Sequence, residues 1–206
     1  DEELGKEVLY SELYQGHVYE NFNSGDLSDL ASITIEDVKA FYSTQLTQAK
    51  LNLGITGAMP SDLKAQLMSD LATLPEGDEK RLTIAKAPVL KGHHATIVEK
   101  NAQSTAVSFG FPIDTIRSDK DWAALWLVRS YFGEHRSSNS YLYQQIRQAR
   151  GMNYGDYSYI EYFPRGMYQT KPDANLGRSS QIFQVWLRPL RSNNDAHFAT
   201  RAALYE

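Results

Sequence analysis

The sequence of 206 residues contains no cysteine and carries a formal net charge of -4, with 21 Lys and Arg against 25 Asp and Glu. The lack of cysteine excludes a disulfide framework, a thiolate metal site and a cysteine nucleophile. The acidic balance argues against a nucleic-acid partner, and no apolar run reaches the roughly 18–20 residues that cross a bilayer, so we expect no transmembrane segment.

The first elements are predicted from the spacing of apolar residues. Residues 3–15 and 35–46 repeat apolar side chains at helical intervals, so both are predicted helices. Thr34 and Asp37 stand three residues apart at the start of the second helix, as in a capping box. Gly16 is a plausible stop for the first helix.

The next two elements complete the first part of the chain. Residues 51–56 alternate apolar and other side chains and predict a strand that ends at Gly57. Residues 61–71 then predict a helix that stops before Pro75. The charged, proline-interrupted segment 76–92 is the best internal linker candidate.

The second part of the chain predicts a mixture of paired strands and paired helices. Strands are expected at 95–98, 105–111, 157–163 and 180–187, helices at 118–133, 141–150 and 195–205, and a polar loop at 164–178. Helices and strands alternate in pairs rather than singly, which favours an α+β fold with an antiparallel sheet and helices packed on one face.

Three groups of residues invite functional interpretations but have simpler structural ones. The aromatic residues at helical spacing, among them Trp122 and Trp126, are interpreted as core. The adjacent residues His93 and His94 lie in a linker and are interpreted as solvated. Glu134 and His135 would complete an inverted zinc motif, His-x-x-Glu-His, only if histidine stood at Tyr131, so we interpret them as an exposed or mutually paired helix-end turn.

Arg147 and Tyr154 are the more informative candidates. Arg147 lies on the predicted helix 141–150, and Tyr154 follows Gly151, which occupies the position favoured for a left-handed helix cap. A guanidinium and a phenol brought together there could stabilise an oxyanion, one by charge and the other by O–H donation. Residue spacing alone does not show that they converge, and a surface arginine with a buried tyrosine is the simpler alternative.

Four motifs in order resemble the pitrilysin/insulinase family of zinc metallopeptidases. They are the "gly-his" turn at 13–19, with Val18 in place of the usual proline, the capped helix and strand at 33–57, the strand signature at 109–112, and the helix 141–154 with its arginine, glycine and tyrosine. The resemblance extends over nearly the whole chain.

The resemblance implies an α+β unit of a clam-shell metallopeptidase. It assigns residues 1–32 to the tail of a preceding lobe and residues 33–206 to a C-terminal-type lobe that is truncated at its C-terminus. Segment 76–92 would then be an internal loop rather than a domain boundary. One half of such an enzyme carries the zinc motif, and the other carries an arginine and a tyrosine seven positions apart, the spacing of Arg147 and Tyr154. These two residues are therefore the implied catalytic residues, Tyr154 donating to the oxyanion and Arg147 holding the substrate backbone or the same charge.

The implied function is that of a zinc-dependent endopeptidase fragment acting on peptides or small unfolded proteins. No zinc triad is present, so zinc is expected in the full-length enzyme or in a homologous partner half, and none bound to this fragment, which we expect to be inactive alone. In the family, a glycine-rich segment usually precedes the helix that carries the arginine, and here the polar segment 134–140 stands in its place.

Two alternatives remain, a non-catalytic structural or processing-complex homologue and an unrelated binding module. The chain starts without Met and ends in a helical pattern with no stop signal, so we expect a piece of a longer protein. A periplasmic location is slightly favoured over a cytoplasmic one, by analogy with exported bacterial members of the family.

Overall fold

The protein is described from a computed structural model covering residues 2–22, 24–78, 80, 83–163, 171–172, 177–191 and 193–206. The chain divides into two compact units, one of residues 1–24 with 84–206 and one of residues 25–83. The division falls inside the segment 76–92. The assignment of residues 1–32 and 33–206 to two lobes stays a prediction.

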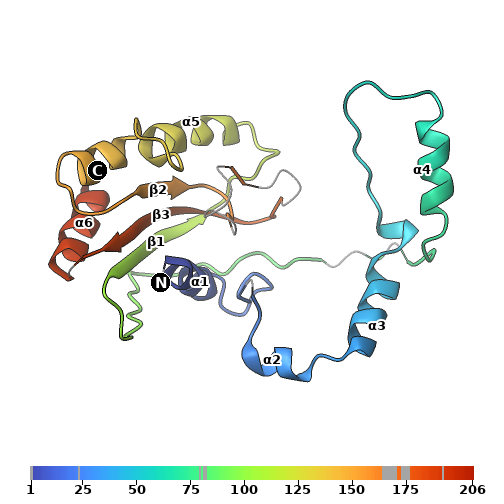
Figure 1. The fold of residues 1–206 in the computed structure, drawn as a ribbon, viewed down its shortest axis with the longest axis horizontal. Helices are drawn as coiled ribbons and strands as arrows, with labels where there is room; N and C mark the ends of the chain where they lie inside the picture. The colour runs from blue at the N-terminus through green and yellow to red at the C-terminus, as the bar shows by residue number, and fades with distance from the viewer. Residues whose placement is uncertain are drawn as a thin grey trace. The chain divides into compact units, whose positions relative to one another are not determined.

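The larger unit is built on a three-stranded antiparallel sheet with the strand order β1-β3-β2 (Figure 1). The strands are β1 (Thr105–Ile113), β2 (Asp156–Tyr159) and β3 (Gln181–Leu190). The central strand β3 pairs Val185 with Phe109 of β1 on one side and with Ser158 of β2 on the other. The α+β class and the antiparallel sheet are thus as the sequence predicts.

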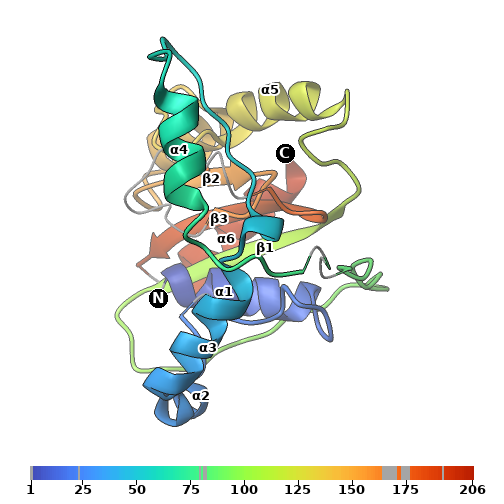
Figure 2. The same cartoon turned by 90° about the vertical axis from the view of Figure 1, so that its right-hand side faces the viewer.

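Opposite faces of this sheet are covered by different helices, as Figures 1 and 2 show for α1 and α5. These helices are α1 (Glu2–Leu13), α5 (Trp122–Gly133), the π-helix η2 (Tyr143–Gln148) and α6 (Asn193–Tyr205). Val185 and Leu187 point into a cluster with residues of η2 and α6. Ile182, on the other face, packs against α1. Helices α5, η2 and α6 thus share one face, and α1 takes the other.

The second face also holds a buried ring cluster beside α1. It consists of Tyr157, Tyr159, Phe163 and Trp186. The ammonium group of Lys6 lies 5.0 Å from the centre of the Trp186 ring and donates to the Phe163 carbonyl at 3.3 Å. Because a buried ammonium needs hydrogen-bond partners, these contacts and the ion pair with Glu3 at 2.6 Å explain how Lys6 is kept inside.

The smaller unit contains α2 (Leu27–Ser32), α3 (Ile35–Gln45), the short 3-10 helix η1 (Gln48–Lys50) and α4 (Leu63–Leu71). The predicted capping box is present: Asp37 N donates to Thr34 Oγ1 at 3.2 Å, and Thr34 N donates to Asp37 Oδ2 at 2.8 Å. α2, capped by Asp26, begins where the sequence analysis placed no element.

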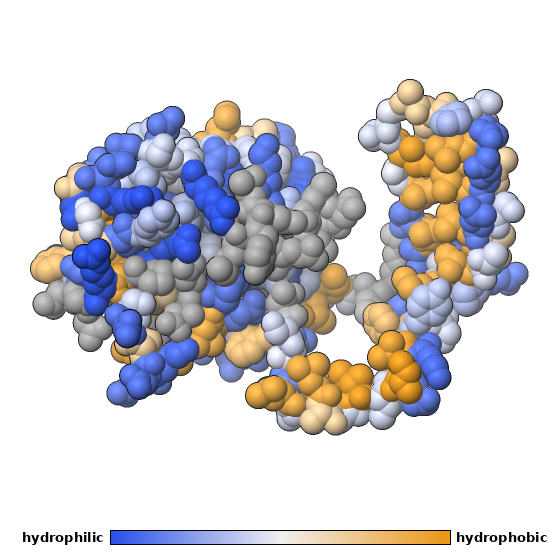
Figure 3. Space-filling model, in the orientation of Figure 1, coloured by the Kyte–Doolittle hydropathy of each residue, from blue (hydrophilic) through white to orange (hydrophobic). Residues whose placement is uncertain are grey.

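Apolar side chains in the smaller unit remain exposed, and Figure 3 shows them gathered along α2, α3 and α4. None of these three helices contains a buried residue. The exposed set comprises Leu27, Leu30, Ile33, Ile35, Val38, Phe41, Tyr42, Leu46, Leu51, Leu53, Ile55, Met59 and Met68.

Several sequence predictions differ from the structure in detail. Residues 51–56 and 95–98 form no strand, because a strand requires a partner to take its backbone hydrogen bonds and neither segment has one among the described residues. The strand predicted at 157–163 is limited to β2. α5 begins at Trp122, with Asp121 rather than Ser118 in the N-cap position. Most of the predicted 164–178 loop lies outside the described residues.

Candidate functional site

The helix η2 fixes where Arg147 lies. Leu142, just before the helix, and Ile146 within it are fully buried in the core cluster beside the sheet, whereas the next residue, Arg147, is only partly buried. The helix is wound as a π-helix, with Ala149 N donating to Gln144 O at 3.0 Å. Such turns are uncommon and frequently occur at functional sites.

Gly151 then reverses the chain. Its φ is +61°, in the left-handed region, and its N–H donates to the Arg147 carbonyl at 2.8 Å. The expected left-handed cap at Gly151 is therefore present. The reversal leads from η2 to β2 within a few residues, and Tyr154 lies on this connection.

Arg147 and Tyr154 are in direct contact. Arg147 Nη1 donates to the Tyr154 carbonyl at 2.8 Å, and the guanidinium carbon lies 4.2 Å from the centre of the Tyr154 ring. The ring of Tyr143 is a second aromatic contact at 4.8 Å. Tyr154 is 67% exposed and Arg147 is half-buried, so the pair reaches the surface. The simpler alternative, in which Tyr154 is buried in the core, is wrong.

This arrangement places a fixed positive charge beside a phenol. A guanidinium over an aromatic face is held by cation–π attraction, and the carbonyl contact holds it in one orientation. The Tyr154 hydroxyl remains able to donate to a ligand, and the guanidinium keeps further N–H groups for an anion or a peptide carbonyl. Chemically, the pair is suited to stabilise negative charge on an oxygen.

Asp156 follows Tyr154 by two residues and was not identified from the sequence. It is the first residue of β2 and is fully buried, opposite Leu187 of β3. Burial raises the pKa of its carboxyl group from 3.8 to about 7, against the opposing effects of the Asn153 hydrogen bond and the Arg147 charge. The sequence held no signal for it: Asp156 and Ser158 alternate with two tyrosines, which is typical of a solvent-facing polar side, yet all four residues of β2 are buried.

Asn153 connects Asp156 to the turn. Its Nδ2 donates to Asp156 Oδ1 at 2.6 Å and to the Gly155 carbonyl at 3.2 Å. The neighbouring backbone is tied to β3, since Arg188 N donates to the Gly155 carbonyl at 3.0 Å. Hydrogen bonds therefore anchor the turn that carries Tyr154 at both ends, to η2 and to β3.

Glu134 and His135 form no metal site with each other. Glu134 Oε1 pairs with the buried Arg129 at 3.2 Å. His135 Nδ1 lies 2.7 Å from the Tyr159 hydroxyl, and its ring contacts Phe163 edge-on at 5.3 Å. The interpretation of this segment as an exposed or mutually paired turn is wrong for His135, which is 5% exposed because it packs into the ring cluster. His93 and His94 are exposed, as expected.

The residues present do not fit a zinc ion. Among the residues that the structure describes, no three His, Asp or Glu side chains gather closely enough to hold a metal. The side chain at 131 is a tyrosine, which stacks on Tyr141 at 5.8 Å between ring centres. Over the same residues, none of the helices has the length and apolar character needed to span a membrane.

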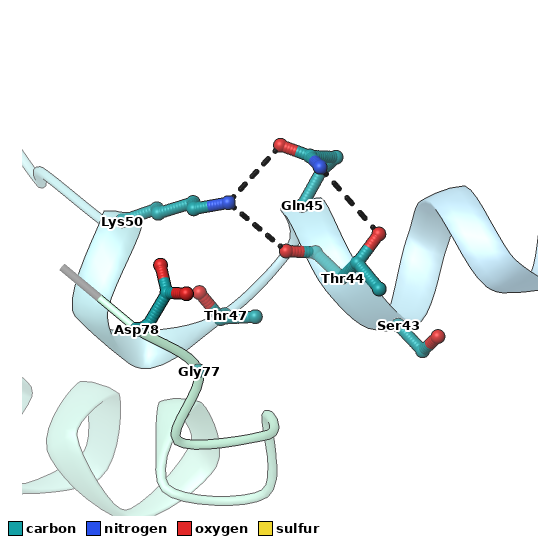
Figure 4. A pocket seen from close by; sticks show the side chains of 7 residues that line it. All are labelled: Ser43, Thr44, Gln45, Thr47, Lys50, Gly77 and Asp78. Carbon is teal, nitrogen blue, oxygen red and sulfur yellow. Dashed lines mark hydrogen bonds between the residues drawn. The ribbon is translucent and has the colours of Figure 1, made fainter. Parts of the chain in front are cut away.

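A shallow polar recess occurs in the smaller unit (Figure 4). Its volume is about 360 Å³, and it is lined by Ser43, Thr44, Gln45, Thr47, Lys50, Gly77 and Asp78. Lys50 Nζ is already engaged by the Thr44 carbonyl at 3.1 Å and by Gln45 Oε1 at 3.2 Å. The recess is therefore formed by the polar turn that follows α3. Arg147 and Tyr154 are not among the residues that line it.

Comparison with known structures shows the same fold in proteins of low sequence identity. The peptidase M16 inactive domain from Pseudomonas fluorescens has a TM-score of 0.69 at 21% identity, covering 97% of this chain and 44% of that one. A protease from Helicobacter pylori has a TM-score of 0.67 at 19% identity, covering 90% and 42%. Complex III2 from Candida albicans, with Inz-5 bound, has a TM-score of 0.66 at 14% identity, covering 95% and 45%.

This chain thus spans less than half the length of these structures. No curated protein matches the sequence. The family described as "Peptidase M16 inactive domain" matches residues 32–173, which is more than half of the chain. The antiparallel sheet and this match agree with the resemblance noted from the four motifs, and the chain belongs to the peptidase M16 inactive-domain family, the C-terminal-lobe type of the pitrilysin/insulinase peptidases.

Proposed function

We propose that this chain supplies the oxyanion-binding and substrate-binding wall of a zinc endopeptidase whose metal is held by other sequence. The observation that carries this proposal is the contact of Arg147 with Tyr154, in which a surface phenol and a fixed guanidinium share one site. The substrates would be peptides or small unfolded proteins, and the partner a homologous zinc-bearing half in the same polypeptide or in a second subunit.

The two residues would act on the charge that develops during peptide hydrolysis. As the scissile carbonyl becomes tetrahedral, its oxygen gains negative charge, and the Tyr154 hydroxyl would donate a hydrogen bond to it. Arg147, held in place by the Tyr154 carbonyl, would contribute its positive charge or bind a substrate carbonyl next to the scissile bond. Because both groups are positioned before substrate binds, little reorganisation is needed at the transition state.

The test is a pair of tyrosine substitutions in the complete enzyme assembled with its zinc-bearing half. Tyr154→Phe should lower kcat by about 10- to 1000-fold, the usual effect of removing one oxyanion donor. Tyr131→Phe is the matched control: Tyr131 is 68% exposed, like Tyr154, but lies on α5 away from Arg147. An unchanged kcat in Tyr154→Phe would rule out the oxyanion role.

A second candidate is a structural homologue without catalysis. The description of the matching family as an inactive domain favours it. In that case the assembly that contains this chain would show no peptidase activity with any zinc-bearing half, and Arg147 and Tyr154 would contribute only to the stability of the turn between η2 and β2.

A further inference from the structure

The buried carboxyl group of Asp156 has an incomplete set of partners. Asn153 Nδ2 satisfies Oδ1 at 2.6 Å, whereas Oδ2 has no hydrogen-bond donor among the described residues, although the side chain is fully buried. A buried carboxylate without donors is costly, and a neutral carboxyl group in the same place much less so. The observed arrangement therefore suits the protonated form of Asp156.

Few charged groups face Asp156. From η2 the charge that acts on it is Arg147, which favours the ionised form. From β3 the directly opposite residue is the apolar Leu187, while the guanidinium of Arg188 lies 5.9 Å from the Tyr154 ring. From the turn itself the neighbours are Asn153 and Tyr154. Arg147 is thus the cation whose charge acts on Asp156.

We propose that Asp156 is a positioning residue for Arg147: its carboxyl group, held by Asn153 beneath the turn, decides whether the guanidinium lies on Tyr154 or turns inward. With Asp156 neutral, the guanidinium keeps the contact seen here, on the Tyr154 ring and carbonyl. With Asp156 ionised, the unpaired Oδ2 draws Arg147 towards it, because an opposite charge is the strongest compensation for a buried carboxylate. The consequence for catalysis rests on the proposed function, but the movement of Arg147 does not.

The switch should operate near neutral pH. Burial raises the pKa of Asp156 to about 7, so the carboxyl group is mostly neutral at pH 5.5 and mostly ionised at pH 8.5. Raising the pH across this range would remove positive charge from the surface beside the Tyr154 hydroxyl. An oxyanion or a substrate carbonyl would then lose one of its two contacts.

The movement can be measured by NMR on the 206-residue chain with labelled arginine. Nuclear Overhauser contacts between the Arg147 side chain and the Tyr154 ring should be strong at pH 5.5 and at least threefold weaker at pH 8.5, with a midpoint near 7. In Asp156→Asn they should stay strong at both pH values. Asp114→Asn, an exposed control on the same unit, should behave like the wild type.

A second variant tests the same idea without altering the carboxyl group. Asn153→Ala removes a hydrogen bond that favours ionised Asp156, so the midpoint should move to higher pH. Equal pH dependence in the wild type and in Asp156→Asn would overturn the proposal, as would an unchanged midpoint in a folded Asn153→Ala chain.

Activity measurements separate this proposal from the one on which it rests. In the complete enzyme, kcat/KM should fall above the midpoint in the wild type and remain level in Asp156→Asn. If Tyr154→Phe leaves activity unchanged, the proposed function fails, yet the NMR result still decides whether Asp156 positions Arg147. If the NMR titration is absent while Tyr154→Phe is impaired, the proposed function stands and the role of Asp156 is overturned.

Discussion

Gly133 ends α5 directly against the backbone of Ser158 in β2. A Cβ atom added to Gly133 would lie 2.6 Å from the Ser158 nitrogen and 3.1 Å from the Tyr157 carbonyl carbon. Ser158 Oγ completes the contact by donating to the Arg129 carbonyl at 3.2 Å. The absence of a side chain at Gly133 therefore sets how closely α5 approaches the edge of the sheet.

Gly133→Ala should destabilise the larger unit by about 1–3 kcal/mol, because the nearest atom that it would meet is the backbone nitrogen of Ser158, which cannot move aside without shifting β2. The free energy of unfolding, measured by urea denaturation, checks this value. Gly5→Ala in α1 is the control, since its new Cβ would meet only Ser108 Oγ at 3.6 Å. That variant should gain about 0.5–1 kcal/mol from better helix propensity. Equal stability of the two variants would contradict the close approach.

Asp156→Asn should change how stability depends on pH. The native pKa of about 7 exceeds the ordinary value of 3.8, so the folded state binds more protons than the unfolded state between these values. Stability from this group is therefore fully present below about pH 4 and is lost as pH rises to about 7, by at most about 1.4 kcal/mol per pH unit. The variant lacks this loss, so its stability relative to wild type should be higher at pH 8 than at pH 5. A constant difference between the two proteins would show that Asp156 titrates normally.

Local signals in the sequence predicted most helices of both units, although α2 was missed. The capping box of Thr34 and Asp37 and the left-handed Gly151 are each determined by a few neighbouring residues, so they form wherever the segment lies. The convergence of Arg147 and Tyr154 could be anticipated only through the family resemblance. Spacing alone does not report that the π-helix and the turn after it direct both side chains to one place.

Features that depend on distant segments were missed or wrong. Residues 51–56 alternate correctly for a strand, yet a strand exists only when another strand takes its hydrogen bonds. His135 was interpreted as exposed, because the sequence does not show that residues 157–163 and Trp186 build an aromatic cluster around it. Asp156 was overlooked for a similar reason: its burial depends on pairing with β3, which comes much later in the chain.

Thr34→Ala should loosen the start of α3. The substitution removes the acceptor for the Asp37 N–H and leaves the first turn of the helix without its cap. Such a loss corresponds to about a fivefold increase in amide hydrogen exchange for the first turn. Thr44→Ala is the control at the other end of the helix, where the hydroxyl donates to carbonyls of the preceding turn and caps no backbone N–H. If both variants raise exchange equally, the capping box does not fix the start of α3.

The isolated chain should bind no stoichiometric zinc. Over the described residues no cluster of metal-binding side chains exists, and the best motif in the sequence has Tyr131 in the place of a histidine. His135, the one histidine of that motif, already contacts the Tyr159 hydroxyl at 2.7 Å inside the ring cluster. Metal analysis after dialysis against zinc should give far less than one ion per chain, both in the wild type and in His135→Gln. Tight zinc binding that is lost in His135→Gln would show that this histidine leaves the cluster to bind metal. The zinc site of the proposed enzyme would then lie in this chain and not in a partner half.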